Sequence, residues 1–226
     1  IFCQGTGRDI GGPISFLCYA YGSPNWTLFG LSGIACFTPR LAAMNMVAGD
    51  IQFEDAAQLS PERYNDPDFK VPELMIIWGR GTRGSQCADH YYSSHWVVDL
   101  MKRGTKFIVI DPRQTWMSTR AEKWLQLRPG TDCALALGMM NVIINEELYD
   151  KEFVEKWTYG FEDLKKRVQE YPPEKVAEIT WAKAEDIVEA ARMYAKAKPA
   201  SIRWGQPLDS NANSIGTIQA LNCLWA

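Results

Sequence analysis

The sequence has little of what a metal site built only from protein side chains requires. It has two histidines, His90 and His95, and its six cysteines include no Cys-x-x-Cys pair and no Cys/His pair at zinc spacing. Structural zinc sites depend on such short, fixed spacings, so none is expected here. At this length and cysteine density a disulfide scaffold is not expected either. Most of the cysteines should be reduced and buried.

A strong charge of one sign and long apolar runs are also missing. The formal net charge is −3, and no basic tract is interleaved with aromatic residues. Nucleic acid and anionic lipid are therefore not expected partners. The apolar runs are far shorter than the roughly 20 residues that span a bilayer, and no targeting segment is recognisable. With 46% hydrophobic residues among 226, the chain can bury one sizeable core.

Two apolar segments predict buried strands of a parallel sheet. Residues 74–79 and 107–110 are almost entirely apolar, as in strands that are covered on both faces. Pro112 cannot donate a backbone hydrogen bond, so it ends the second strand and leaves Asp111 and Arg113 at its carboxyl edge. Ligands of open α/β sheets bind at this edge. We therefore expect both residues to lie in a ligand site.

Glycine-rich turns follow the predicted strands. The turn at 79–84 begins with Gly79, Arg80 and Gly81 and contains three glycines and two arginines in all. The glycines would let the backbone approach a diphosphate, and the arginines would neutralise its charge. Gly205 and Gln206 begin a similar turn after a short strand at 199–204. The Asp and Asn side chains that follow, at positions 209, 211 and 213, are either ligand contacts or the cap of a helix at 214–225. Another turn, at 5–7, is either a phosphate cradle or an ordinary loop.

Pro129-Gly130-Thr131-Asp132 ends a further short apolar segment and opens a helix at 133–145. Backbone amides at a helix start can hold an anion. Gly130 allows close approach, and Thr131 is expected to cap the helix. The carboxylate of Asp132 is expected to point outward, where it can accept paired N–H donors such as a guanine edge.

Apolar spacing predicts several more helices. An apolar stretch at 14–21 should form a helix packed on the sheet, and Phe153 and Trp157 should point inward from theirs. The other helices are expected at 39–46, 86–103, 146–157, 162–170, 171–179, 184–197 and 214–225.

Cys36 lies on an irregular segment, because Gly33 and Pro39 disfavour regular structure on both sides of it. A helix beginning near Pro39 would favour the thiolate through its dipole. A thiolate suits a soft, high-valent metal centre as a protein ligand. A lone cysteine is also commonly a buried core residue, so the residues alone leave both interpretations open.

The order of these motifs resembles a known family. One ordered set of features resembles the pterin-dinucleotide-binding region of the molybdopterin oxidoreductases of the dimethyl sulfoxide reductase family. It consists of a strand, Asp111-Pro112-Arg113, the run Trp124-Leu-Gln-Leu-Arg-Pro-Gly-Thr-Asp132, and a helix. Gly22-Ser23-Pro24-Asn25 resembles the family segment that precedes the metal ligand, which makes Cys36 the expected ligand. The family often shows Trp-Gly-x-Asn-Pro where this chain has Gly81 and Thr82 in place of Asn-Pro.

The resemblance implies an α/β fold, a Rossmann-like parallel sheet flanked by helices, with edges of a second α/β domain. Residues 1–24 would belong to an adjoining domain. Residues 25–202 would form the pterin-dinucleotide-binding domain with a helical insertion at 133–197, and 203–226 would return into the adjoining domain. The family's cysteine-rich segment for a 4Fe–4S cluster is not seen in this sequence. The chain is therefore expected to be an internal fragment, inactive alone.

The implied function is that of a catalytic subunit. It would bind bis-molybdopterin guanine dinucleotide with molybdenum or tungsten, act on a small-molecule redox substrate and exchange electrons with an iron–sulfur subunit or domain. Cys36 would be the catalytic metal ligand. The implied cofactor contacts are Gly79, Arg80, Gly81, Asp111, Arg113, Gly130, Asp132, Gly205 and Gln206.

Several other function classes also use glycine turns at strand ends. A nicotinamide-dependent dehydrogenase should show Gly-x-Gly-x-x-Gly and an acid about twenty residues later, and the turn at 5–7 lacks both. A nucleotide-binding scaffold without catalysis and a non-redox hydratase of the same family stay open. Formate dehydrogenases carry His after the metal ligand, whereas Phe37 follows Cys36 and cannot relay a proton. Formate is therefore not the expected substrate.

Overall fold

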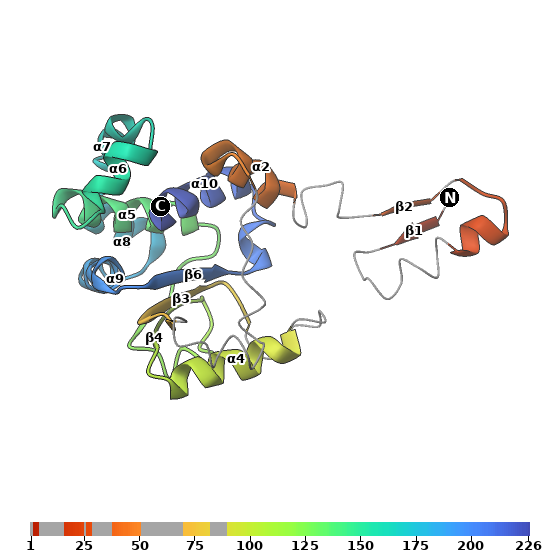
Figure 1. The fold of residues 1–226 in the computed structure, drawn as a ribbon, viewed down its shortest axis with the longest axis horizontal. Helices are drawn as coiled ribbons and strands as arrows, with labels where there is room; N and C mark the ends of the chain where they lie inside the picture. Colours follow the sequence, from red (N-terminus) through yellow and green to blue (C-terminus); the bar gives the residue numbers. More distant parts are fainter. Residues whose placement is uncertain (1, 5–15, 25, 29–37, 51–69, 82–89) are drawn as a thin grey trace.

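The computed structural model describes residues 2–4, 16–24, 26–28, 38–50, 70–81 and 90–226. Its centre is a sheet of four parallel strands in the order β5-β4-β3-β6, shown in Figure 1. The predicted α/β architecture, a parallel sheet flanked by helices, is confirmed. The strands are β3 (Leu74–Trp78), β4 (Lys106–Ile110), β5 (Lys123–Leu125) and β6 (Ala200–Trp204).

The four strands end level with one another. Trp78 at the end of β3 pairs with Ile110 of β4 on one side and Trp204 of β6 on the other. Ile110 in turn pairs with Leu125, the last residue of β5. Whatever follows each strand therefore begins at the same edge of the sheet.

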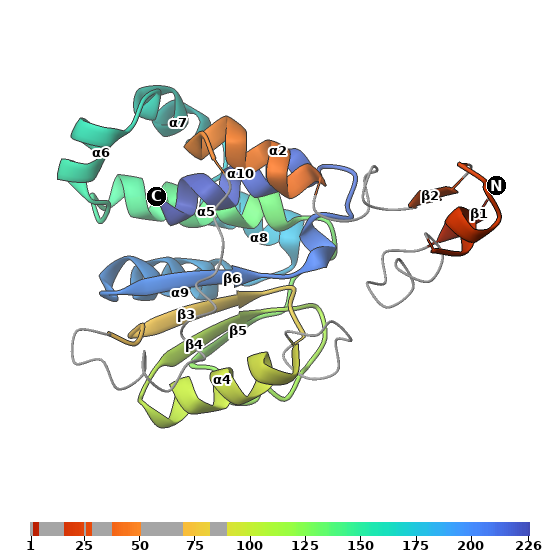
Figure 2. The same ribbon diagram turned by 45° about the vertical axis from the view of Figure 1, so that its right-hand side comes forward.

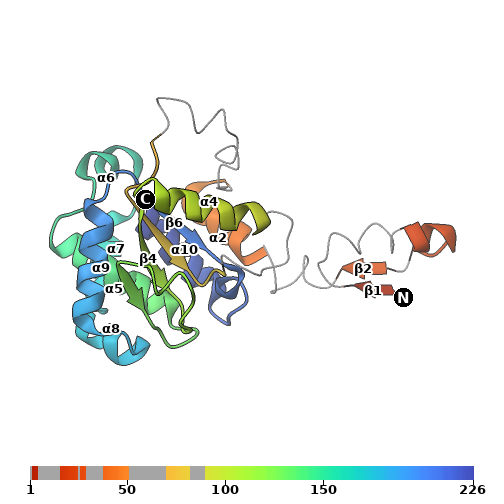
Figure 3. The same ribbon diagram turned by 90° about the horizontal axis from the view of Figure 1, so that it is seen from below.

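Helices cover both faces of the sheet, which is why β3 is apolar throughout. Met75 and Ile77 face α4 (His90–Lys102) and pack with its Val97 and Leu100. Leu74, Ile76 and Trp78 face the larger core on the opposite side. Of the labelled helices, Figures 2 and 3 show α4 on one side of the sheet and the others on the opposite side.

The larger core is built around α5 (Asp132–Asn145), most of whose residues are buried. Ile218 and Leu221 of α10 lie in the same core as Leu135 of α5. Residues 203–226 thus pack on the same body as the sheet, and the domain boundaries stay a prediction. The remaining helices are α2 (Thr38–Ala48), α6 (Lys151–Trp157), α7 (Phe161–Val168), α8 (Pro173–Thr180), α9 (Ala184–Lys196) and α10 (Ser214–Trp225).

Two packing predictions were wrong. Residues 16–20 are helical, but Phe16 and Tyr19 are exposed and do not pack on the sheet. Helix α6 has no buried residue, and Trp157 is exposed instead of pointing inward. Apolar spacing predicts which residues share a helix face, but not whether a neighbouring element covers that face.

The amino-terminal strands β1 (Phe2–Gln4) and β2 (Trp26–Leu28) pair in parallel with each other. Figure 1 shows them apart from the four-stranded sheet. Among the helices in the described ranges, none is both long and apolar enough to cross a bilayer.

Candidate cofactor site at the carboxyl edge of the sheet

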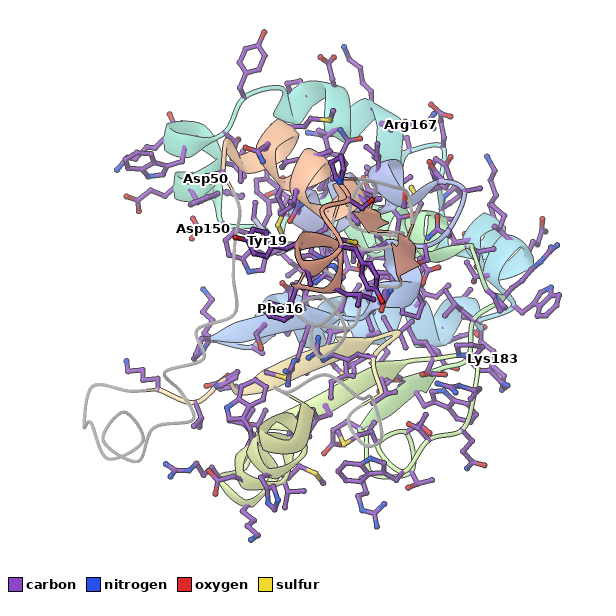
Figure 4. The ribbon with its side chains drawn as sticks, turned by 90° about the vertical axis from the view of Figure 1, so that its right-hand side faces the viewer. Phe16, Tyr19, Asp50, Asp150, Arg167 and Lys183 are labelled. Carbon is purple, nitrogen blue, oxygen red and sulfur yellow. The ribbon has the colours of Figure 1, made fainter. Side chains whose placement is uncertain are left out.

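The structure brings all the predicted cofactor contacts to one edge of the sheet, which Figure 4 turns toward the viewer. Residues 79–81 follow β3, Asp111 and Arg113 follow β4, and Gly205 and Gln206 follow β6. Gly130 lies in the connection from β5 to α5, and Asp132 is the first residue of α5. Cys36 and Thr82 lie outside the described residues. Location at this edge agrees with the sequence analysis, while the binding role of each residue stays a prediction.

Gly79 and Gly205 are required by the packing of two turns against each other. Gly79 has a φ of +56°, and a Cβ added to it would lie 2.8 Å from Cδ1 of Leu208. A Cβ added to Gly205 would lie 2.1 Å from the carbonyl oxygen of Gly79 and 2.9 Å from Cα of Arg80. The Gly205 N–H also donates to the carbonyl of Trp78 at 2.9 Å. These glycines therefore have a structural reason to be present, independent of any ligand.

In the turn after β4, the side chain of Asp111 is buried and that of Arg113 is exposed. The buried Asp111 carboxylate accepts from the backbone N–H of Arg113 at 2.8 Å and from its Nε at 3.4 Å. The Asp111 carbonyl accepts from Nε1 of Trp124 at 2.9 Å. The Arg113 side chain is 75% exposed. Asp111 thus shapes the turn, and the guanidinium of Arg113 is the group that a dissolved anion can reach.

The carboxylate of Asp132 is turned inward, so the predicted outward orientation was wrong. Asp132 is only 8% exposed, and its Oδ1 accepts from Nε1 of the buried Trp78 at 2.8 Å. Burial raises the pKa of Asp132 above its ordinary value. Hydrogen bonds from Trp78 and from the backbone N–H groups of Asp132 and Gly130 lower the pKa, but by less than burial raises it. A ligand that donates to this carboxylate must share it with the indole of Trp78.

The turn before Asp132 is held by Thr131 in a way that differs from the prediction. Thr131 occupies the N-cap position of α5 without a side-chain capping hydrogen bond. Its hydroxyl instead donates to the carbonyl of Arg128 at 2.6 Å. Gly130 has a φ of +82° and open space where a Cβ would stand. The turn is therefore fixed by its own backbone and opens toward solvent at Gly130.

Asp209 makes a contact that neither predicted alternative included. It is 1% exposed and accepts from Nε of Arg40 at 3.2 Å, with Nη2 of Arg40 contacting its other oxygen. The guanidinium of Arg40 also lies 5.4 Å from the ring centroid of Trp204. This cluster joins the loop around the 3₁₀ turn η2 (Gln206–Leu208) to the first turn of α2. The partners are 169 positions apart, so local sequence patterns gave no signal for the pair.

Asp209→Asn is expected to lower the stability of the full-length protein by about 3 kcal/mol, because it removes the charge of the buried carboxylate that pairs with the Arg40 guanidinium. The thermal unfolding midpoint measures the loss. Asp99→Asn is the matched control, since Asp99 pairs with Arg103 on the exposed surface of α4, where such pairs contribute below about 1 kcal/mol. Equal shifts for the two variants would contradict a structural role for the Asp209 pair.

Comparison with known proteins identifies the family. Residues 34–222 match the family model described as molybdopterin oxidoreductase. The chain belongs to this family.

Relatives within the family include enzymes of different reaction types. Acetylene hydratase from Syntrophotalea acetylenica is 43% identical over 199 residues, which cover 88% of this chain and 25% of the relative. Formate dehydrogenase H from Escherichia coli (strain K12) is 38% identical over 152 residues, covering 67% of this chain and 22% of the relative. The chain thus spans about a quarter of the length of these molybdopterin oxidoreductases.

A solved structure supports the same fold. Acetylene hydratase from Pelobacter acetylenicus superposes with a TM-score of 0.75 at 37% sequence identity, covering 98% of this chain and 29% of the other. Family membership implies a molybdopterin cofactor with its metal.

The edge fits an anionic cofactor better than a bare metal ion. Among the described residues, no group of three or more His, Cys, Asp or Glu side chains could hold a metal. Burial raises the pKa of the Cys133 and Cys223 thiols, which disfavours the thiolate form that a metal binds. The exposed guanidinium of Arg113 instead offers donors to an anion, and the open space beside Gly130 leaves room for one at the end of the neighbouring strand.

Proposed function

We propose that this chain forms part of the catalytic subunit of a molybdenum or tungsten enzyme. In this proposal the carboxyl edge of the sheet binds one half of a bis-molybdopterin guanine dinucleotide. The level ends of β3, β4, β5 and β6 carry the proposal, because they gather the glycine turns, Arg113 and Asp132 at one edge. A dinucleotide that lies along this edge reaches all of them.

Each part of the dinucleotide has a chemical counterpart at the edge. Arg80 and Arg113 supply positive charge for the diphosphate, and the backbone N–H groups at the start of α5 supply donors. Asp132 accepts from N1–H and the 2-amino group of guanine, a donor pair that adenine does not offer. Gly81 and Gln206 line the same edge, where their backbone and amide groups contact the cofactor.

We assign the protein ligand of the metal to Cys36. This residue precedes α2 by two positions, and Arg40 in the first turn of α2 is anchored to Asp209. The bound cofactor supplies two-electron redox chemistry at its metal. A 4Fe–4S cluster and an electron-transfer subunit or domain belong, in this proposal, to the rest of the protein.

The test is the quantity of metal and guanosine released by acid from the purified full-length protein. The proposal expects one molybdenum or tungsten and two guanosine nucleotides for each chain. A nucleotide-binding scaffold without catalysis would release nucleotide without metal.

A non-redox hydratase is the second candidate function, because the 43% identity to acetylene hydratase extends over 88% of this chain. Hydration of an alkyne needs no net electron transfer. The two candidates are separated by assaying acetylene conversion with and without an electron acceptor: a hydratase forms acetaldehyde at the same rate in both.

Formate is expected not to support steady dye reduction by the full-length enzyme. Phe37 follows Cys36, and an apolar side chain there cannot accept or relay a proton from the substrate. The measurement is formate-dependent reduction of a viologen dye, with formate dehydrogenase H as the positive control. Sustained turnover by the unmodified enzyme would contradict the prediction.

A further inference from the structure

Trp181 adopts a backbone conformation that is unusual for a large side chain. Its φ is +67°, in the left-handed region, at the carboxyl end of α8. Helices commonly end there in glycine, since a Cβ is strained in this conformation. The chain places its largest side chain at such a position. Its indole is also 69% exposed, so burial in the core does not account for it.

A cation lies against this indole. The Arg128 guanidinium carbon is 5.3 Å from the ring centroid of Trp181, within the range of a cation–π contact. The backbones are joined as well, because the Arg128 N–H donates to the carbonyl of Thr180 at 2.7 Å. The aromatic ring and the guanidinium are thus held together on an exposed surface.

This pair is connected to the turn that leads into Asp132. The Arg128 carbonyl accepts from the backbone N–H of Thr131 at 3.3 Å and from its hydroxyl at 2.6 Å. Gly130, between them, leaves open space beside the turn. Figure 4 shows Lys183, two residues beyond Trp181, at the margin of the end of the sheet that faces the viewer. Through Arg128, the indole is therefore connected to the turn that leads into the proposed guanine site.

We propose that Trp181, held by Arg128, is a stacking surface for the guanine base of the dinucleotide. The inference rests on the proposed function and deepens it. An exposed indole offers a π-face to any base, and a neighbouring guanidinium adds attraction for the ring and for a nearby phosphate. Stacking is tolerant of base identity, whereas the hydrogen bonds to Asp132 select guanine. Trp181 would thus supply affinity, and Asp132 would supply specificity.

Trp181→Gly provides the test, because glycine accepts the left-handed conformation without strain. The full-length protein, prepared without cofactor, is titrated calorimetrically with GDP and with ADP. We expect Trp181→Gly to weaken both nucleotides by about tenfold or more, with an unfolding midpoint that is unchanged or raised. Trp181→Phe should retain most of the affinity. Trp157→Ala, which removes an exposed indole from α6, is the control and should leave both affinities unchanged.

The outcomes separate this inference from the function on which it rests. If Trp181→Gly binds GDP as tightly as the unmodified protein while Asp132→Asn loses GDP, the stacking surface is refuted and the guanine site stands. If the unmodified protein binds no GDP, both fail. A large loss of stability in Trp181→Gly would also overturn the proposal, because it would show that the indole is needed for folding.

Discussion

Gly205→Ala is expected to prevent the carboxyl edge of the sheet from forming. The new Cβ would lie 2.1 Å from the carbonyl oxygen of Gly79, whereas real Cβ atoms essentially never come within 3.0 Å of another heavy atom. The opposing atoms are backbone, and β3 and β6 are paired along their whole length. The strain can be relieved only by separating the two turns. We expect a loss of about 3–5 kcal/mol, at the upper end for a single substitution.

The thermal unfolding midpoint and the cofactor content of the full-length protein measure this effect together. Gly104→Ala is the matched control. Gly104 also has a positive φ, +95°, but open space surrounds its Cβ position. Its substitution adds only backbone strain, about 1 kcal/mol. A Gly205→Ala variant as stable as Gly104→Ala would contradict the close crossing of the two turns.

Asp132→Asn is expected to cause the largest loss of cofactor. The asparagine keeps an oxygen that can accept from the Trp78 indole, as Oδ1 of Asp132 does at 2.8 Å. Its amide nitrogen, however, turns one acceptor into a donor facing the donors of guanine. Loss of a buried, paired carboxylate costs about 2–5 kcal/mol of binding. We therefore expect purified full-length Asp132→Asn to contain little guanosine and little metal. Cofactor contents equal to those of the unmodified protein would contradict guanine recognition by Asp132.

The stability of the cofactor-free variant shows whether this loss comes from misfolding. Because burial raises the pKa of Asp132, the native state binds more protons than the unfolded state between the ordinary value, 3.8, and the raised one. Stability of the unmodified protein then falls as pH rises through that window. The amide that Asp132→Asn introduces does not titrate, so the variant should gain relative stability over the same window. A variant that is less stable at neutral pH would indicate that the carboxylate is mainly structural.

The parts of the site that lie next to strand ends could be predicted from the sequence. Continuous apolar runs located β3 and β4, and Pro112 located the end of β4, because proline cannot extend a ladder. Because the carboxyl ends of parallel strands lie at the same edge of a sheet, Arg113 and Asp132 were both expected at that edge. These features depend on residues close together in the chain, where local patterns are informative.

Orientation and long-range pairing could not be predicted. Asp132 turns inward because an indole from a different strand donates to it. Arg40 reaches Asp209 across almost the whole chain, and Gly205 is required because another turn crosses it. Each depends on how distant elements pack, which no local pattern encodes. The exposed Trp157 has the same cause, since nothing in α6 itself shows whether its apolar face is covered.

The most direct test of the proposed cofactor site is a crystal structure of the full-length protein with its metal and cofactor bound. The distance from guanine N1 and its 2-amino nitrogen to the carboxylate oxygens of Asp132 decides the question. Hydrogen-bond distances of about 2.7–3.2 Å, with the Trp78 contact kept, are the expected result. A guanine base bound elsewhere, with Asp132 bonded only to Trp78 and its own backbone, would contradict the assignment.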